Sequence, residues 1–295
     1  MWVLKLLLYT NTQMHFTGIP MSFTRLAIGL YKRSPLYPAW GRRLGNALLS
    51  ARKFAGVRPI HTRHVPCGIT LNLDREQHID AKALAGCFEP QTIALIERVV
   101  ETGWICCDVG ANIGIITLLM AKRVGPTGNV FALEPSDWTF KRLRANIEIN
   151  PYNWIDARRV AVGAKSKPTF ELRVPCGYRL DGNDTSTVQQ MPMVTLDDIF
   201  ATETRLEFLK IDTDGYESEV LSGSRKTIKR LRPIILFELC PDHLKRAGSD
   251  AADVTSFLVQ MGYQFENEDG HTIHPPVEAL KLYRNGSMNV LARPI

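Results

Sequence analysis

The chain has 295 residues, of which 45% are hydrophobic and 22% are charged. This composition can build a sizeable core and excludes a largely disordered protein. No apolar run approaches the roughly 20 residues that a membrane-spanning helix needs, so an integral membrane protein is not expected. The six cysteines show no regular spacing, which argues against a disulfide framework and favours a reducing, cytoplasmic compartment.

Charge is distributed unevenly along the chain. Residues 1–73 contain ten Lys and Arg residues and no Asp or Glu, so the remaining 222 residues carry a net charge of −4. We expect a basic N-terminal extension over residues 1–64, partly helical or disordered, and a catalytic domain over residues 65–295. A basic arm favours contact with something anionic, such as a membrane surface. A transit peptide and a solvated extension are the alternatives.

Hydrophobic periodicity predicts helices and strands in alternation from residue 65 onwards. The expected strands are 68–74, 104–108, 129–134, 157–162, 206–212, 233–239, 263–266 and 287–292, and the expected helices are 77–86, 90–101, 113–124, 136–150, 218–231 and 254–261. Ser136 is placed to cap the helix that follows it. A polar insertion rich in Gly, Asp, Ser and Thr covers residues 177–187.

This alternation is typical of an α/β fold with a doubly wound, mostly parallel sheet and helices on both faces. The last two expected strands follow each other too closely for a helical crossover, so the final strand should run antiparallel. Ligands of such sheets bind outside the carboxyl ends of the strands, near the point where the strand order reverses. The residues that follow each strand are therefore the first candidates for a functional site.

A glycine-containing turn follows the strand that ends at Asp108. Residues 108–114 read DVGANIG, in which Gly110 allows a tight turn and Gly114 permits close packing of a helix. Asn112 stands where a dinucleotide-binding fingerprint has its second glycine, so this is not that fingerprint. We expect the aspartate to accept a hydrogen bond from a ligand ammonium group, and the asparagine to contact the carboxylate of the same ligand.

A second acid ends the next expected strand. Glu134 lies 26 residues after Asp108, and a carboxylate at this position can accept two hydrogen bonds from a ribose diol. An amino-acid head group beside a ribose describes S-adenosyl-L-methionine, the cofactor that the sequence predicts. An ordinary strand–helix connection is the alternative.

Several motifs together resemble the FkbM family of class I S-adenosylmethionine-dependent methyltransferases. They are DVGANIG (108–114), ALEP (132–135), TLDD (195–198), LKIDTDGYESEVLSG (209–223), RPIILFE (232–238) and NVL (289–291). The resemblance covers about residues 65–292. It implies O-methylation of a sugar, lipid or polyketide hydroxyl, and it implies Glu89 and Ala161 as further cofactor-binding positions. One departure is Asp214, where the family commonly has Glu.

Methyl transfer from a sulfonium to a hydroxyl is an in-line displacement that a positioned base assists. Asp212 ends the strand expected beside that of Asp108, and we expect it to act as the base or to orient the hydroxyl. Glu238 at the next strand end is its expected partner, with Asp214 nearby. The alternative role for Asp212 is to cap the next helix. Three carboxylates could also hold a divalent cation, but their spacing is not diagnostic and we predict no metal.

Other features of the sequence are discounted. His243 is interpreted as a surface residue at a helix start, and no zinc site is expected at His271 and His274. Neither a cysteine nor an (Asn/Asp)-Pro-Pro-aromatic motif follows the expected strand 206–212, where similar base-methylating enzymes carry them, which disfavours nucleic-acid bases as substrates. The leading prediction is O-methylation of a glycan, glycolipid or secondary metabolite. The alternatives are an RNA methyltransferase and a catalytically degenerate scaffold, and acceptor choice is assigned to residues 1–64 and 177–187.

Overall fold

The computed structural model describes residues 68–74, 77–84, 86, 88–175, 186–274 and 287–295. All of the described residues belong to one compact unit. The predicted basic extension over residues 1–64 therefore lies outside the described residues, as does most of the polar insertion. Within the described ranges, no helix is both long and apolar enough to cross a membrane.

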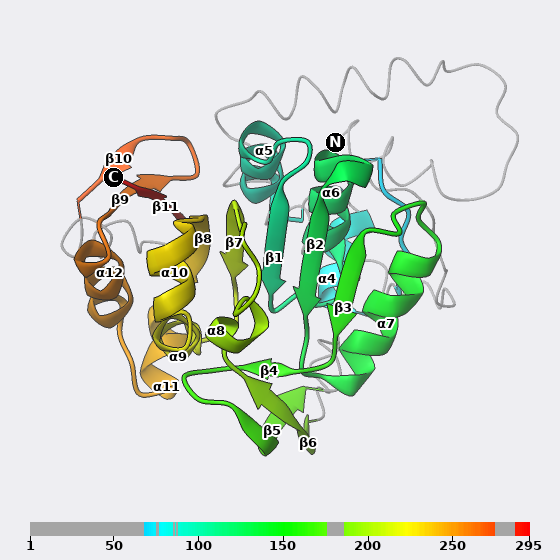
Figure 1. Ribbon diagram of the computed structural model, residues 1–295. Coiled ribbons are helices and arrows are strands. Elements are labelled where there is room, and N and C mark those ends of the chain that lie inside the picture. The colour runs from blue at the N-terminus through cyan, green and yellow to red at the C-terminus, as the bar shows by residue number, and fades with distance from the viewer. Residues whose placement is uncertain (1–67, 75–76, 85, 87, 176–185, 275–286) are drawn as a thin grey trace, which may run out of the picture. The chain divides into compact units, whose positions relative to one another are not determined.

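A sheet of eight strands forms the centre of the described unit (Figure 1), in the order β10-β9-β11-β8-β7-β1-β2-β3. The strands are β1 (Ile105–Val109), β2 (Asn129–Leu133), β3 (Ile155–Arg158), β7 (Phe208–Ile211), β8 (Ile234–Leu239), β9 (Tyr263–Asn267), β10 (Thr272–Ile273) and β11 (Met288–Pro294). Strands β8, β7, β1, β2 and β3 are mutually parallel, whereas β11 is antiparallel to both β8 and β9. The predicted mostly parallel sheet with a final antiparallel strand is confirmed.

Helices cover both faces of this sheet (Figure 1). They are α4 (His78–Leu84), α5 (Pro90–Val99), α6 (Ile115–Val124), the short η1 (Gly125–Thr127), α7 (Asp137–Glu148), α8 (Leu196–Ile199), α9 (Glu217–Ser222), α10 (Arg225–Leu231), α11 (Pro241–Arg246) and α12 (Ala251–Gln260). The side chain of Ser136 accepts a hydrogen bond from the backbone N–H of Thr139, which confirms the predicted cap.

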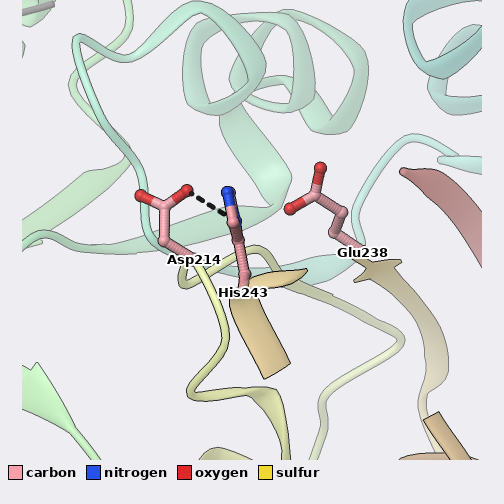
Figure 2. Close-up of side chains that lie close together, drawn as sticks. All are labelled: Asp214, Glu238 and His243. Atoms are coloured by element: carbon pink, nitrogen blue, oxygen red, sulfur yellow. Dashed lines mark ion pairs between the residues drawn. The ribbon is translucent and has the colours of Figure 1, made fainter. Parts of the chain in front are cut away.

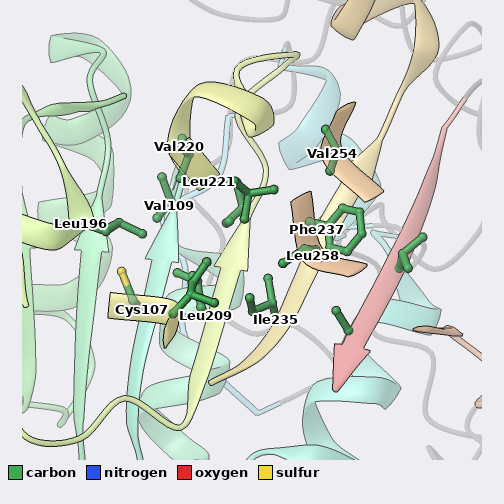
Figure 3. Close-up of a cluster of buried hydrophobic side chains, with 14 of the residues drawn as sticks. Cys107, Val109, Leu196, Leu209, Val220, Leu221, Ile235, Phe237, Val254 and Leu258 are labelled. Atoms are coloured by element: carbon green, nitrogen blue, oxygen red, sulfur yellow. The ribbon is translucent and has the colours of Figure 1, made fainter. Parts of the chain in front are cut away.

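The core follows the alternation of side chains along β1. Cys106 belongs to a buried cluster with α5 and α6, whereas Cys107 belongs to the opposite cluster with α9, α10 and α12 (Figure 3). Successive residues of a strand point to opposite faces, so Asp108 shares the α5 and α6 face with Cys106. The near-continuous apolar sequence of β1 reflects burial on both sides.

The prediction of a strand over residues 68–74 is wrong. Ile69, Leu71 and Leu73 are buried, as the alternation indicated, but the segment belongs to no strand. Its backbone is instead held by side chains that lie at the end of α7 and just beyond it. Asn146 accepts a hydrogen bond from the N–H of residue 72, and Asn150 bonds both the N–H and the carbonyl of residue 70. These side-chain amides make the hydrogen bonds that the backbone of a neighbouring strand would make.

Two further predictions need correction. The expected strand 157–162 is divided into β3 and β4 (Ala161–Val162), and β4 joins a separate three-stranded sheet in the order β4-β6-β5. Strands β5 (Lys167–Pro175) and β6 (Ser186–Val194) of that sheet were not predicted. The expected helix 218–231 is two helices, α9 and α10, which separate at Gly223. A Cβ atom at that glycine would lie 2.1 Å from the carbonyl oxygen of Gly163, so only a glycine allows this close approach of the two backbones.

Candidate active site

The predicted site residues meet where β8, β7, β1 and β2 end, and we call this side of the sheet the carboxyl edge. Parallel pairing aligns β1 with β7 on one side and with β2 on the other, and it aligns β7 with β8. The turn after β1, the acid after β2, the acids after β7 and Glu238 of β8 are therefore brought to one edge. This is the arrangement that the sequence predicted for them.

The turn after β1 is fixed by close backbone contacts. Gly110 has a φ of 81°, and a Cβ atom there would lie 1.8 Å from the carbonyl oxygen of Asp212. The N–H of Asp212 in turn donates to the carbonyl of Val109. Gly114 has a φ of 92°, and its Cβ would lie 2.6 Å from the side chain of Leu143 in α7. Any side chain at either glycine would push apart elements that form this edge.

Glu134 is bound to the same turn by both of its oxygens. Oε2 accepts a hydrogen bond from the N–H of Asn112 at 3.0 Å, and Oε1 accepts one from the N–H of Ser136 at 2.9 Å. Burial raises the pKa of Glu134 to about 7, although these backbone donors act in the opposite direction. A carboxylate offers about four acceptor positions, so each oxygen keeps capacity for one more donor.

Asp108 is fully buried below the turn. Its Oδ2 accepts a 2.7 Å hydrogen bond from the hydroxyl of Thr117 in α6, while Oδ1 is a buried acceptor with no hydrogen-bond partner among the described residues. Burial raises the pKa of this carboxyl, and the neighbouring Lys210 ammonium partly offsets the rise. Among the described residues, the nearest cation to Oδ1 is the Lys210 ammonium at 3.7 Å, so a ligand donor at hydrogen-bond distance would be favourable here.

Lys210 was missed by the sequence analysis. It is a buried residue of β7, in register with Asp108, and its Nζ lies 2.9 Å from Oδ2 of Asp212 and 3.7 Å from Oδ1 of Asp108. Burial acts to lower the pKa of this lysine, but the carboxylates of Asp212, Asp108 and Glu89 outweigh it and raise the pKa. A single Lys inside the apolar strand FLKI is the sequence signal that could have identified it.

Glu89 and Glu238 complete the group of acids. Glu89 precedes α5 in a left-handed conformation with a φ of 32°, and its Oε2 is buried without a hydrogen-bond partner among the described residues. Burial and the carboxylate of Asp212 raise the pKa of Glu89 to about 7. The same two causes, in the same order, raise the pKa of Glu238 to about 8. Several acids that favour the protonated state at one edge are typical of a functional site.

The loop after β7 places Asp214 beside α11. Asp214 has a φ of 53°, and its Oδ1 lies 3.3 Å from Nδ1 of His243. This histidine lies at a helix start, as interpreted, but its side chain is half-buried and faces Asp214 and Glu238 (Figure 2). Ala161, by contrast, lies in the separate three-stranded sheet. Its cofactor-binding role stays a prediction.

The comparisons with known proteins agree with this geometry. Residues 108–265, more than half of the chain, match the model of the methyltransferase FkbM domain. The chain is 29% identical over 175 residues to the hexuronic acid methyltransferase AglP of Haloferax volcanii, covering 58% of this chain and 67% of that protein. It is 26% identical over 158 residues to methyltransferase 1 of Beauveria bassiana, covering 45% of this chain and 63% of that protein. The matches thus span about two-thirds of these relatives.

Among solved structures, an FkbM methyltransferase from Methylobacillus flagellatus KT aligns with a TM-score of 0.43 and 20% identity, covering 65% of this chain and 43% of that one. A superposition of this quality supports no statement about substrate. The match to the family model is the decisive comparison, because it begins at Asp108 and takes in the turn after β1, the acid after β2 and the acids after β7 and β8. The chain belongs to the FkbM family of methyltransferases, whose cofactor is S-adenosylmethionine.

Proposed function

We propose that this protein transfers a methyl group from S-adenosylmethionine to a hydroxyl group of a glycan, glycolipid or secondary metabolite. The observation that carries the proposal is the placement of Asp212 at the carboxyl edge directly beside the turn that follows Asp108, with Glu238 on the next strand. One end of the edge offers partners for a nucleoside and an amino acid, and the other offers carboxylates that can accept a proton.

The residues of the first end suit the cofactor. Oδ1 of Asp108 is a buried acceptor in need of a donor, which the ammonium group of an amino acid can supply. Glu134 has acceptor capacity left for a ribose diol. Gly110 and Gly114 keep the turn close to the strand ends, where a Cβ atom would collide with backbone or with a side chain. We assign cofactor binding to these residues, to Asn112 and to Glu89, whose Oε2 also lacks a donor.

The residues of the second end act on the acceptor. The cofactor, when bound, supplies a methyl group on a positively charged sulfur that an acceptor oxygen can displace in line. Asp212 orients the acceptor hydroxyl and takes its proton, while Lys210 holds the aspartate in place through Oδ2. Glu238 lies near it, and burial raises the pKa of Glu238 to about 8, so this side chain can hold or accept a proton near neutral pH. Positioning of the two reacting groups supplies much of the rate in reactions of this kind.

A glycan is the acceptor class that the relatives favour, because one of them is named as a hexuronic acid methyltransferase. A hexuronic acid presents both hydroxyls and a carboxylate. The second end of the carboxyl edge is itself rich in carboxylates, and like charges at close range repel. This charge distribution favours a hydroxyl, rather than a free carboxylate, as the reacting group.

The test is methyl transfer from isotopically labelled S-adenosylmethionine to a panel of hexuronic acid oligosaccharides, neutral oligosaccharides and RNA. We expect a labelled glycan whose methyl group survives mild alkali, as an ether does, and we expect Asp212→Asn to lose most of this activity. A label released by alkali would indicate an ester and overturn the hydroxyl assignment. Label in RNA alone would favour the RNA methyltransferase alternative.

A further inference from the structure

Three side chains from different elements converge beside the acceptor end of the carboxyl edge (Figure 2). Asp214 comes from the loop after β7, Glu238 from β8 and His243 from the first turn of α11. Each contributes one atom that can bind a metal, and these three atoms all lie within 4.8 Å of one another. No other group of three acids, histidines or cysteines with this property occurs in the described part of the chain.

The backbone holds this arrangement in place. Gly215 has a φ of 112°, and a Cβ atom there would lie 2.4 Å from the carbonyl oxygen of His243, so the loop packs directly against α11. Glu217 fixes the same loop, because its Oε1 accepts hydrogen bonds from the N–H of Thr213, the hydroxyl of Thr213 and the N–H of Gly215. These contacts place the loop that carries Asp214 against the helix that carries His243.

The spacing suits a metal ion of ordinary size. Ligand atoms bound at about 2.0–2.2 Å lie roughly 3 Å apart at right angles and at most about 4.4 Å apart on opposite sides of the ion. Oδ1 of Asp214 and Nδ1 of His243 are 3.3 Å apart, which is close to the first value. Since all three atoms lie within 4.8 Å of one another, the widest pair needs a contraction of at most about 0.4 Å to reach the second value.

The charges and hydrogen bonds of these three side chains also favour a bound cation. The carboxyl groups of Asp212, Asp214 and Glu217 lie close enough to Glu238 to interact with it electrostatically. Nδ1 of His243 is buried and makes no hydrogen bond to any described residue. A cation at this point would relieve the repulsion among the acids and would bind both Nδ1 of His243 and the Asp214 oxygen that lies 3.3 Å from it.

We propose that Asp214, Glu238 and His243 bind a divalent cation beside the acceptor site. Two carboxylate oxygens and one imidazole nitrogen suit manganese, iron(II) or zinc better than calcium. The function that we assign to this cation rests on the proposed methyl transfer. It polarises the acceptor hydroxyl, so that a carboxylate, which is a weak base in general, suffices to take the proton. The sequence predicted no metal and set His243 aside.

The test uses Mn²⁺ alone as the probe, added to the full chain without S-adenosylmethionine or acceptor. Binding is followed by the loss of the electron paramagnetic resonance signal of free Mn²⁺. We expect one tight site, which Asp214→Asn, Glu238→Gln and His243→Gln each weaken by roughly 10- to 100-fold or more. The matched controls Asp269→Asn, Glu101→Gln and His271→Gln are exposed residues, and we expect them to bind Mn²⁺ like the unmodified protein.

A second measurement on the unmodified protein does not depend on how the variants fold. Electron spin echo spectra of the bound Mn²⁺ should show coupling to one imidazole nitrogen. Absence of Mn²⁺ binding, binding without nitrogen coupling, or folded variants that bind Mn²⁺ normally would each overturn the site. Titration with S-adenosylhomocysteine separates the two proposals. If the unmodified protein binds Mn²⁺ but does not bind S-adenosylhomocysteine, the methyltransferase mechanism is contradicted and the cation site still stands.

Discussion

The Nζ atom of Lys210 lies 2.9 Å from Oδ2 of Asp212, inside a strand whose other residues are apolar and buried. The same ammonium group lies 3.7 Å from Asp108 on the neighbouring strand. It therefore joins the acid that we assign to the cofactor with the acid that we assign to the acceptor. One buried cation allows two carboxylates to lie side by side at the carboxyl edge.

Lys210→Met should lower the free energy of unfolding by roughly 3–5 kcal/mol, because it leaves two carboxylates without their buried cation. Urea denaturation measures this change. The exposed Lys229→Met is the matched control and should stay within about 0.5 kcal/mol of the unmodified protein. Adding Asp108→Asn to Lys210→Met should recover part of the loss. A Lys210→Met protein as stable as the control would show that the ion pairs contribute little.

Gly110→Ala and Gly248→Ala form a matched pair, with φ values of 81° and 82°. The added Cβ at Gly248 would meet nothing within 4 Å, so this variant should lose only the roughly 1–2 kcal/mol that a left-handed conformation costs. At Gly110 the Cβ would lie 1.8 Å from the carbonyl oxygen of Asp212. We expect a loss above about 4 kcal/mol in urea denaturation. Equal losses would disprove the close approach of the two strand ends.

Thr117→Val tests the buried environment of Asp108. The variant keeps the shape of Thr117 but removes the 2.7 Å hydrogen bond to Oδ2 of Asp108, and it should cost about 1–3 kcal/mol of stability. Thr255→Val is the control, since the hydroxyl of Thr255 donates to the backbone carbonyl of Ala251 within α12. Thermal unfolding of both should show the larger decrease in Tm for Thr117→Val, and the reverse order would contradict the assignment.

Stability should fall as pH rises through the range in which Glu134 ionises. Burial raises the pKa of Glu134 to about 7 in the folded protein, whereas an unfolded glutamate has a pKa near 4.3. Between these values the folded state binds the additional proton, so raising the pH favours the unfolded state. The unmodified protein should lose roughly 2–3 kcal/mol relative to Glu134→Gln between pH 5 and pH 8. Parallel stability curves for the two proteins would refute this.

The sequence predicted the central sheet and most of the site because both depend on local patterns. The buried strands β1 and β7 are apolar apart from Asp108 and Lys210, and an acid lies at or just beyond the end of each strand. Parallel order then brings Asp108, Glu134 and Asp212 to the same edge without further information. Gly110 could be assigned to a tight turn from its place in the motif, although its contact with residue 212 could not.

What the sequence could not supply depends on contacts between distant segments. The apolar alternation at Ile69 and Leu71 resembles a strand, but the partner is a pair of asparagine side chains some 75 to 80 residues away. Strands β5 and β6 have mixed polar and apolar faces, so their pattern is weak. His243 looked like a surface residue because nothing local indicates that Gly215 draws the preceding loop against α11.

The most direct measurement is a calorimetric titration with S-adenosylhomocysteine of the unmodified protein and of Glu134→Gln. Glu101→Gln is the control, since this exposed residue precedes β1 at the opposite end of the strand. We expect micromolar binding that Glu134→Gln weakens by roughly 10- to 100-fold, through the loss of charged hydrogen bonds, and that the control leaves unchanged. Absence of binding by the folded, unmodified protein, or equal affinity in all three proteins, would contradict the assignment of this edge to the cofactor.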